Sequence, residues 1–411
     1  MTSNTTTTMP RARNTAPKLA GIDGLRGVAA LAVLVYHVQR GLNPSSRDNV
    51  FFHDLTYLSH GVTLFFVLSG FLLYRPFAGA LLGRMPHPYL RRYFVSRFLR
   101  IFPAYLVVLW ATSIALRTAF LPRNNNGAAQ QTGALSWPDL LLASTLAQGA
   151  TPRSIRSGLE VAWTLGVELS FYILLPAAVW LAAIIGRRCR GRLTAALIPP
   201  CLFLALGLTG KLWLQITQMG LTGSERVNLE WGANWGAVAA RSILIHADLF
   251  AYGMLAALAL HLAHAHAPRF FDRPMIRVSL QAIVLAVTAG LVIGLITGPF
   301  TSSVVAIAAA ALLLLTATAS GQSPLYGITN APILRWCGIV SFSVYLWHLP
   351  VIRWLHNRGW VFPDTYWGLL INIALILSLT LLFAAATYYA IEAPALRMKD
   401  RHRDTRWPRH A

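Results

Sequence analysis

Long apolar runs, separated by short polar segments, recur along nearly the whole chain. Ten of them have eighteen or more residues, close to the length that an α-helix needs to cross a hydrocarbon core of about 30 Å. This pattern predicts an all-α polytopic membrane protein, a bundle of about ten transmembrane helices. The expected spans are residues 21–42, 60–83, 101–120, 163–185, 193–213, 237–262, 278–297, 302–319, 336–356 and 367–390.

The composition leaves little room for a separate soluble domain. The chain is 55% hydrophobic and 12% charged, whereas soluble domains carry about 25% charged residues. We expect a polar cytoplasmic tail over residues 1–20, a membrane domain over 21–396 and a basic cytoplasmic tail over 397–411. Residues 137–149 are apolar but too short to span, so they are expected to be interfacial or re-entrant.

The net charge of +21 comes from basic residues that cluster between the apolar runs. On alternating segments that start inside, 22 of the 35 lysines and arginines fall on one side. The positive-inside rule then predicts that both termini are cytoplasmic in a multi-pass protein of the cell (inner, or plasma) membrane. Because the bilayer accounts for the charge, no nucleic-acid partner is expected. Residues 1–20 lack the short apolar core of a removable signal peptide.

The first span contains three costly ionisable groups, Asp23 and Arg26 at its head and His37 deep inside. Arg26 and His37 are eleven residues apart, which is about 16 Å along a helix. With Arg26 near the inner surface, His37 is expected near the midplane, and the two would mark the ends of one reaction chamber. The simpler alternative is an arginine that reaches the membrane surface and a histidine that is hydrogen-bonded to a neighbouring helix.

The next two spans supply candidate phosphate ligands. Arg75 is expected near the inner face, a few residues after Ser69, which is a weak candidate nucleophile because no base lies near it in sequence. Arg97 and Arg100 are one helical turn apart where the third span enters the membrane. A guanidinium binds phosphate in a bidentate fork and stacks on aromatic rings. Anchoring to anionic lipid is the alternative interpretation of this basic stretch.

Two later spans add a carboxylate and a second imidazole. Glu168 lies five residues into its expected span, nearer the outer face, and shares a helix face with Tyr172. His348 is expected at a depth similar to that of His37, so the two histidines are candidates for one cavity. The alternatives are an interhelical hydrogen bond for Glu168 and a structural role for His348.

Some further polar residues are expected to have structural roles. Glu392, at the inner end of the last span, is expected to pair with an arginine, and Asp248 is grouped with His246 on the sixth span. No metal site is expected. The cluster of His261, His264 and His266 has no acidic partner at ligand spacing and is read as solvated.

Taken in order, these stretches resemble the acyltransferase-3 family of integral membrane O-acyltransferases. The resemblance covers nearly the whole chain. It rests on DGLRG at 23–27 with Arg26 and His37, FFVLSGF at 65–71, Arg97 with Arg100, WTLGVELSFY at 163–172, SVYLWHLP at 343–350 and IEAPALR at 391–397.

The resemblance implies transfer of an acyl group from an acyl-coenzyme A, such as acetyl-CoA or another short-chain acyl-CoA, to a sugar hydroxyl. The donor is a co-substrate, and no bound cofactor is expected. The acceptor would be an antibiotic macrolide sugar or a cell-surface glycan. His37 is the expected general base, with Arg26 and Glu168 also catalytic, and Arg97, Arg100 and Arg75 bind the donor. The candidate substrate contacts are His348, Tyr345, Trp163, Tyr172 and Ser69.

A proton-coupled transporter that uses Arg26, His37 and Glu168 as a relay is the main alternative. It predicts pseudo-symmetric halves with helices interrupted at corresponding places, and the sequence shows no such pairing. Direct transfer and a covalent acyl-histidine intermediate both fit the residues. The membrane face that receives the acceptor, and the oligomeric state, stay open.

Overall fold

The computed structural model describes residues 19, 21–49, 52–122, 131–189, 191–319, 321 and 323–404. Helices form nearly all of this part of the chain, which confirms the predicted all-α class. Most of the predicted tail 1–20 and the end of the predicted tail 397–411 lie outside the described residues.

Each predicted span overlaps a long helix of the structure, and the spans 237–262 and 336–356 also include part of the short helix that precedes the long one. The largest shift is at α3, which begins eleven residues before the predicted span because the arginine-rich stretch assigned to an inner loop is helical. The helices are α1 (Ile22–Leu42), α2 (Gly61–Leu81), α3 (Leu90–Trp110), α5 (Ala162–Cys189), α6 (Arg192–Thr217), α9 (Ile243–His266), α10 (Pro274–Val292), α11 (Thr301–Ala317), α14 (Ser341–His356) and α15 (Tyr366–Thr387).

By length and composition, seven helical stretches of the described chain are able to cross a membrane, which supports a polytopic membrane protein. The predicted spans outside this set are α1, α11 and α14. Helices α11 and α14 have only 17 and 16 residues, and α1 carries Asp23, Arg26 and Arg40. Most of α14 is buried within the bundle, so it does not need an apolar surface that faces lipid.

Shorter elements connect these helices or continue them. The apolar stretch 137–149 forms α4 (Trp137–Ser144) followed by a 3₁₀ turn, too short to span, as predicted. A small antiparallel hairpin pairs β1 (Ala119–Phe120) with β2 (Thr132–Gly133). The others are η1 (Pro44–Asp48), η2 (His53–His60), η3 (Ala111–Ala115), η4 (Ala147–Ala150), α7 (Gly223–Trp231), α8 (Trp235–Ala240), η5 (Phe270–Asp272), α12 (Pro324–Thr329), α13 (Pro332–Ile339), η6 (Tyr388–Glu392) and α16 (Ala393–Asp404).

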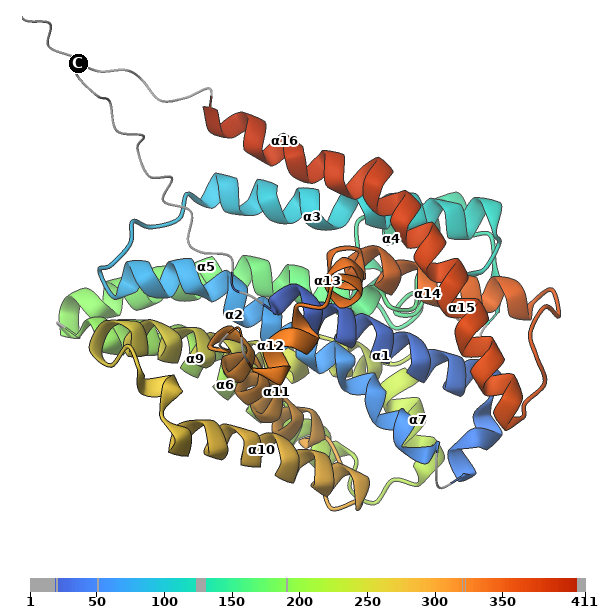
Figure 1. The fold of residues 1–411 in the computed structure, drawn as a ribbon. Helices are drawn as coiled ribbons and strands as arrows, with labels where there is room; N and C mark the ends of the chain where they lie inside the picture. Colours follow the sequence, from blue (N-terminus) through green and yellow to red (C-terminus); the bar gives the residue numbers. More distant parts are fainter. Residues whose placement is uncertain are drawn as a thin grey trace, which may run out of the picture.

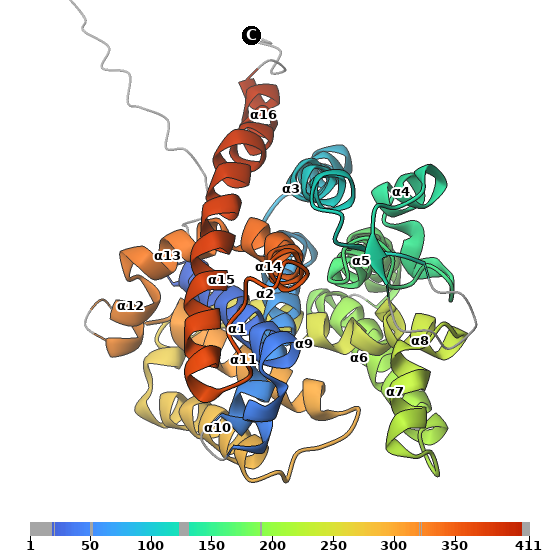
Figure 2. The ribbon, with the colours of Figure 1, turned by 90° about the vertical axis from the view of Figure 1, so that its right-hand side faces the viewer.

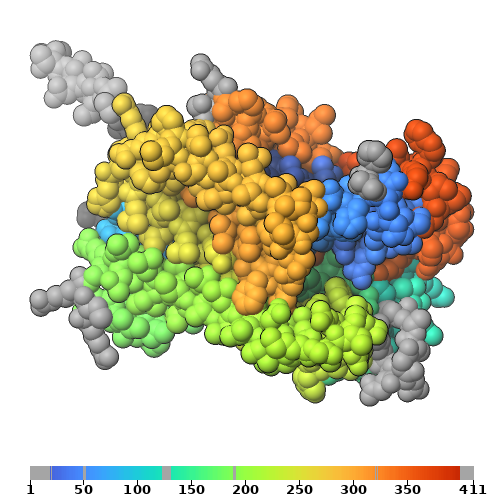
Figure 3. All heavy atoms as spheres, turned by 90° about the horizontal axis from the view of Figure 1, so that it is seen from below, coloured from blue at the N-terminus to red at the C-terminus, as the bar shows by residue number. Residues whose placement is uncertain are grey.

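The centre of the bundle is formed by α1, α2, α9 and α14, with α3, α5, α10 and α15 farther out (Figure 2). From below, α10 (gold) and α6 with α7 (green) cover this centre, beside the η2 turn in blue (Figure 3). Helix α1 runs from left to right and α15 with α16 runs back from right to left (Figure 1). The chain therefore enters and leaves toward the same side, as an even number of crossings requires.

Helices α2 and α9 pack at close range in this centre. A Cβ atom on Gly70 would lie 2.1 Å from the carbonyl oxygen of Phe250, and one on Gly253 would lie 1.9 Å from that of Val67. Small residues let helix backbones approach in a membrane, where packing rather than water exclusion drives association. The contact fixes the part of α2 that carries Ser69 against the helix that carries His246.

Candidate active site

A small cavity of about 110 Å³ lies among α1, α2, α3, α5 and α14, in the half of the bundle that contains the start of α1. Arg26, Arg97 and Arg100 line it together with Glu168. The structure therefore gathers three of the predicted arginines and the predicted carboxylate around one space. We call this space the inner cavity.

Glu168 is the acceptor of a compact hydrogen-bond group in the inner cavity. Its Oε1 atom accepts from Ser69 Oγ at 2.9 Å and from the Tyr172 hydroxyl at 2.5 Å. The predicted i, i+4 pairing with Tyr172 is confirmed. Glu168 was expected nearer the outer face than the arginines, but it lines the same cavity as Arg97 and Arg26.

The two arginines of α3 are held by different partners. Arg100 Nη1 lies 3.4 Å from Glu392 Oε1, and Glu392 Oε2 accepts from Ser343 Oγ at 3.0 Å. The predicted pairing of Glu392 with an arginine is therefore confirmed. Arg97 donates to Ser96 Oγ at 3.0 Å and lies over the Tyr172 ring at 5.8 Å. Arg97 makes no carboxylate ion pair within the described chain, so its charge is available to a ligand.

Arg75 lies apart from this group. It lines neither of the two cavities described here. Its guanidinium lies over Phe71 at 5.7 Å, and its backbone carbonyl accepts from His261 Nε2 at 2.9 Å. The sequence grouped Arg75 with Arg97 and Arg100 because all three were expected near the inner face. In the structure Arg97 and Arg100 line the inner cavity, whereas the Arg75 side chain lies outside it.

A larger cavity of about 430 Å³ occupies the other half of the bundle, among the end of α1 and the starts of α2, α5 and α9. His37 lines it, together with Trp163 and Tyr345. We call this space the outer cavity, because the predicted topology places the end of α1 outside. His37 is fifteen residues into α1, about 22 Å along the helix.

The hydrogen bonds of His37 define its tautomer. Its Nδ1 atom lies 2.8 Å from the carbonyl oxygen of Val33 and 3.3 Å from His348 Nε2. Since a carbonyl oxygen only accepts, Nδ1 carries the proton. In the neutral ring the Nε2 atom then has a free lone pair, which is what a general base needs.

His348 lies behind His37 rather than in a cavity. It is 1% exposed and lines neither of the two cavities. The expectation that the two histidines meet is confirmed by the distance between their ring centres, 4.9 Å. The expected substrate contact is not supported, because buried side chains surround the ring. His348 is placed to orient His37, whereas the hydrogen bonds of Glu168 go to Ser69 and Tyr172.

The two cavities are adjacent. Val62, Phe66 and Tyr345 line both of them. The Tyr345 hydroxyl lies 2.8 Å from Thr164 Oγ1, which fixes the phenol between the arginine-lined space and the space that contains His37. These three side chains therefore form the wall that the two cavities share.

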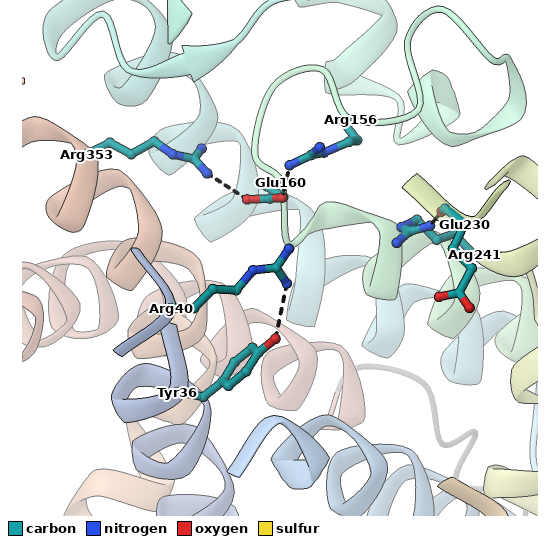
Figure 4. Close-up of polar contacts among 7 residues, drawn as sticks. All are labelled: Tyr36, Arg40, Arg156, Glu160, Glu230, Arg241 and Arg353. Carbon is teal, nitrogen blue, oxygen red and sulfur yellow. Dashed lines mark hydrogen bonds and ion pairs between the residues drawn. The ribbon is translucent and has the colours of Figure 1, made fainter. Parts of the chain in front are cut away.

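Beside His37, the outer cavity contains an ion-pair cluster that the sequence analysis missed. Glu160 accepts from Arg353 at 2.6 Å and from Arg156 on its other oxygen (Figure 4). Burial alone would raise the pKa of the Glu160 carboxyl, but Arg353 and Arg156 lower that pKa to about 2. Glu160 and Arg156 lie in an expected loop, and Arg353 lies in an expected span far away in the sequence. The sequence therefore gave no indication that the three side chains meet.

Outside both cavities, α6, α9 and α11 are joined by a buried ion pair. Lys211 Nζ lies 2.6 Å from Asp248 Oδ2 and 2.7 Å from Ser303 Oγ, and both charged side chains are fully buried. Asp248 and His246 both lie on α9, as grouped in the sequence, but it is Asp248 that binds Lys211. His246 lines the outer cavity instead, with its ring 5.1 Å from that of Trp163.

An arginine-lined cavity that meets a histidine-lined cavity inside a helix bundle is the arrangement expected of a membrane group-transfer enzyme. Comparison with known proteins agrees. Residues 19–389 match the model of the acyltransferase-3 family, which is described as an acyltransferase domain. The chain belongs to this family and is an acyltransferase of the membrane.

Two relatives are similar over most of the chain. Peptidoglycan O-acetyltransferase OatA of Listeria monocytogenes is 24% identical over 393 residues, covering 91% of this chain and 55% of that protein. Acyltransferase MdmB of Streptomyces mycarofaciens is 26% identical over 401 residues, covering 94% of each. The chain thus spans about half the length of the Listeria relative. No solved structure matches it.

Proposed function

We propose that this enzyme is an O-acyltransferase that moves an acyl group from acyl-CoA to a hydroxyl of a sugar-containing acceptor. The observation that supports the proposal is the wall, which includes Tyr345, that the two cavities share. Because the cavities are adjacent, a donor bound by arginines in one half lies next to an acceptor that enters from the other half. Family membership decides against the transporter alternative.

The donor binds at the inner cavity. Arg97 and Arg100 contact the phosphates of acyl-CoA, and Arg26 adds a third positive charge. The cavity of about 110 Å³ is far smaller than pockets for drug-sized ligands, which hold roughly 300–1,000 Å³. Only the narrow thioester arm therefore enters, and the nucleotide stays toward the inner surface. Glu168 offsets part of the arginine charge while holding Ser69 and Tyr172.

The proton transfer follows from the tautomer of His37. Its Nε2 atom removes the proton of the acceptor hydroxyl as that oxygen attacks the thioester carbonyl carbon. The carbon–sulfur bond then breaks, and the imidazolium of His37 gives this proton to the departing coenzyme A thiolate. His348 keeps the ring oriented, and nearby positive charge stabilises the oxyanion in a site of low dielectric constant.

For the acceptor we propose a cell-wall or other cell-surface glycan. The name of the Listeria relative gives peptidoglycan as its acceptor, and we propose an acceptor of that class for this chain. The macrolide sugar suggested by the sequence resemblance is the second candidate. The outer cavity of about 430 Å³ falls within the roughly 300–1,000 Å³ range of small-molecule sites.

Mass spectrometry of labelled product tests the proposed reaction. Purified enzyme in proteoliposomes is incubated with ¹³C-acetyl-CoA and soluble cell-wall glycan fragments or macrolide glycosides. We expect labelled acetyl esters on one acceptor class and an equal release of free coenzyme A. Consumption of acyl-CoA without any ester, or ester formation that does not require acyl-CoA, contradicts the proposal.

Arg97→Ala tests the donor site. Because Arg97 has no carboxylate partner to compensate, its loss is expected to raise the KM for acyl-CoA at least tenfold, with a smaller change in kcat. Steady-state rates at varied acyl-CoA concentration measure both. Arg75→Ala is the matched control, since Arg75 lines neither of the two cavities. Equal effects of the two substitutions would show that Arg97 acts only through general surface charge.

A further inference from the structure

The outer cavity carries an excess of positive charge. Its lining includes three arginines, Arg40, Arg156 and Arg353, against one carboxylate, that of Glu160. Arg156 and Arg353 share Glu160 between them (Figure 4). The positive-inside rule, which explains basic residues on the cytoplasmic side, does not account for arginines at the opposite end of the bundle.

Arg40 is the arginine that this carboxylate does not neutralise. Its Nη1 atom donates to the Tyr36 hydroxyl at 3.1 Å (Figure 4). Its guanidinium lies 5.4 Å from the centre of the Trp231 ring. Within the described chain Arg40 makes no carboxylate ion pair, so most of its donors are available to a ligand.

Arg40 lies close to His37, the proposed general base. Arg40 follows His37 by three residues on α1 and lines the same cavity. Residues three apart on a helix are neighbours, with Cβ atoms about 5–6 Å apart. A group bound by Arg40 therefore lies within one sugar unit of the hydroxyl that His37 would deprotonate.

Trp231 also separates the cavity from a pair of opposite charges. Arg241 lies 3.2 Å from the centre of the Trp231 ring and donates to the backbone carbonyl of Glu230 (Figure 4). Neither Arg241 nor Glu230 lines the cavity. The excess positive charge of the lining therefore comes from Arg40, Arg156 and Arg353.

We propose that the outer cavity selects an anionic acceptor, in which a carboxylate or phosphate on the acylated sugar or its neighbour binds Arg40. This inference rests on the proposed O-acyl transfer and adds the chemical class of its acceptor. A guanidinium binds both anions through charge-assisted, bidentate hydrogen bonds. Arg156 and Arg353, held by Glu160, contribute the field that favours an anion over a neutral sugar.

Matched acceptors test this selection. Methyl glucuronide, methyl glucoside, methyl glucoside 6-phosphate and methyl glucosaminide are compared as acceptors by kcat/KM and as ligands by isothermal titration calorimetry. We expect at least tenfold tighter binding and higher kcat/KM for an anionic sugar than for methyl glucoside, and the weakest binding for the cationic amino sugar. Whichever of the two anionic sugars has the higher kcat/KM indicates whether the natural acceptor carries a carboxylate or a phosphate.

Arg40→Gln supplies the residue-level test. It is expected to remove the preference for anions while leaving binding of methyl glucoside within twofold. Arg358→Gln is the control. Arg358 follows the end of α14 that carries Arg353, and its guanidinium lies 4.8 Å from the centre of the Trp354 ring. It does not line the outer cavity. The preference should survive this change.

The outcomes separate the inference from the proposed function. Equal or better binding of methyl glucoside than of both anions overturns the anionic acceptor even where acyl transfer occurs. Binding of anions that depends on Arg40, with no acyl transfer to any sugar, leaves the site in place and contradicts the proposed function. An anion preference unchanged in Arg40→Gln also overturns the inference.

Discussion

His37→Ala is expected to lower the rate of acyl transfer by about 10²–10⁴-fold, the usual contribution of a positioned general base. The structure gives the reason for expecting this effect. Nδ1 of His37 is bound to the Val33 carbonyl, which leaves Nε2 as the basic atom of a residue that lines the outer cavity. Alanine offers no group that can take the hydroxyl proton.

The measurement is the initial rate of labelled ester formation by purified protein at saturating acyl-CoA. His264→Ala is the matched control, because His264 is exposed near the far end of α9, and its rate should equal that of the wild type. His348→Ala should have a smaller effect than His37→Ala, since His348 only orients the neighbouring ring. More than a tenth of the wild-type rate in a well-folded His37→Ala protein would refute the assignment.

Lys211→Met is expected to destabilise the protein by about 3–5 kcal/mol, because it leaves a buried carboxylate without its partner. Lys211 and Asp248 are both fully buried, and their bond joins α6 to α9. The same lysine contacts Ser303 on α11. Thermal unfolding in detergent, followed by intrinsic fluorescence, measures the loss.

The double variant Lys211→Met/Asp248→Leu separates a buried ion pair from ordinary packing. Replacing both partners by apolar groups removes the uncompensated charge, so most of the lost stability should return. Equal melting temperatures for Lys211→Met and the wild type would contradict the role of the pair. A double variant that melts as low as the single variant would contradict the electrostatic cause.

The helices were predictable because their signal is local. Apolar runs of sufficient length identified each helix of the bundle, and the shortness of 137–149 excluded that stretch as a span. The early start of α3 was missed because its first turns carry Arg91 and Arg92, which read as a loop. Neighbouring helices and aromatic side chains support these turns, and a hydropathy pattern does not contain that information.

The candidate site was predictable where residues share one helix or lie at the same depth. Glu168 and Tyr172, four residues apart, are bonded as expected, and His37 meets His348. Depth alone gave no information on which helices are adjacent. It therefore grouped Arg75 with the wrong arginines.

The same missing information concealed longer-range contacts. The sequence gave no indication that Glu160 binds Arg353, 193 residues away. The sequence also gave no indication that Asp248 pairs with Lys211, which lies on another helix. Charged residues in apolar surroundings find partners through helix packing, and that packing becomes visible only in the folded bundle.

The proposed mechanism depends on a donor from the arginine-lined side and an acceptor from the opposite side meeting at His37. Proteoliposomes with one known protein orientation, loaded with ¹³C-acetyl-CoA on one side and glycan acceptor on the other, test this directly by mass spectrometry of the ester. We predict product only when acetyl-CoA is on the side of Arg97 and the acceptor on the side of Arg40. Equal product when the two compartments are exchanged, or when both substrates are present only on the side of Arg97, would contradict it.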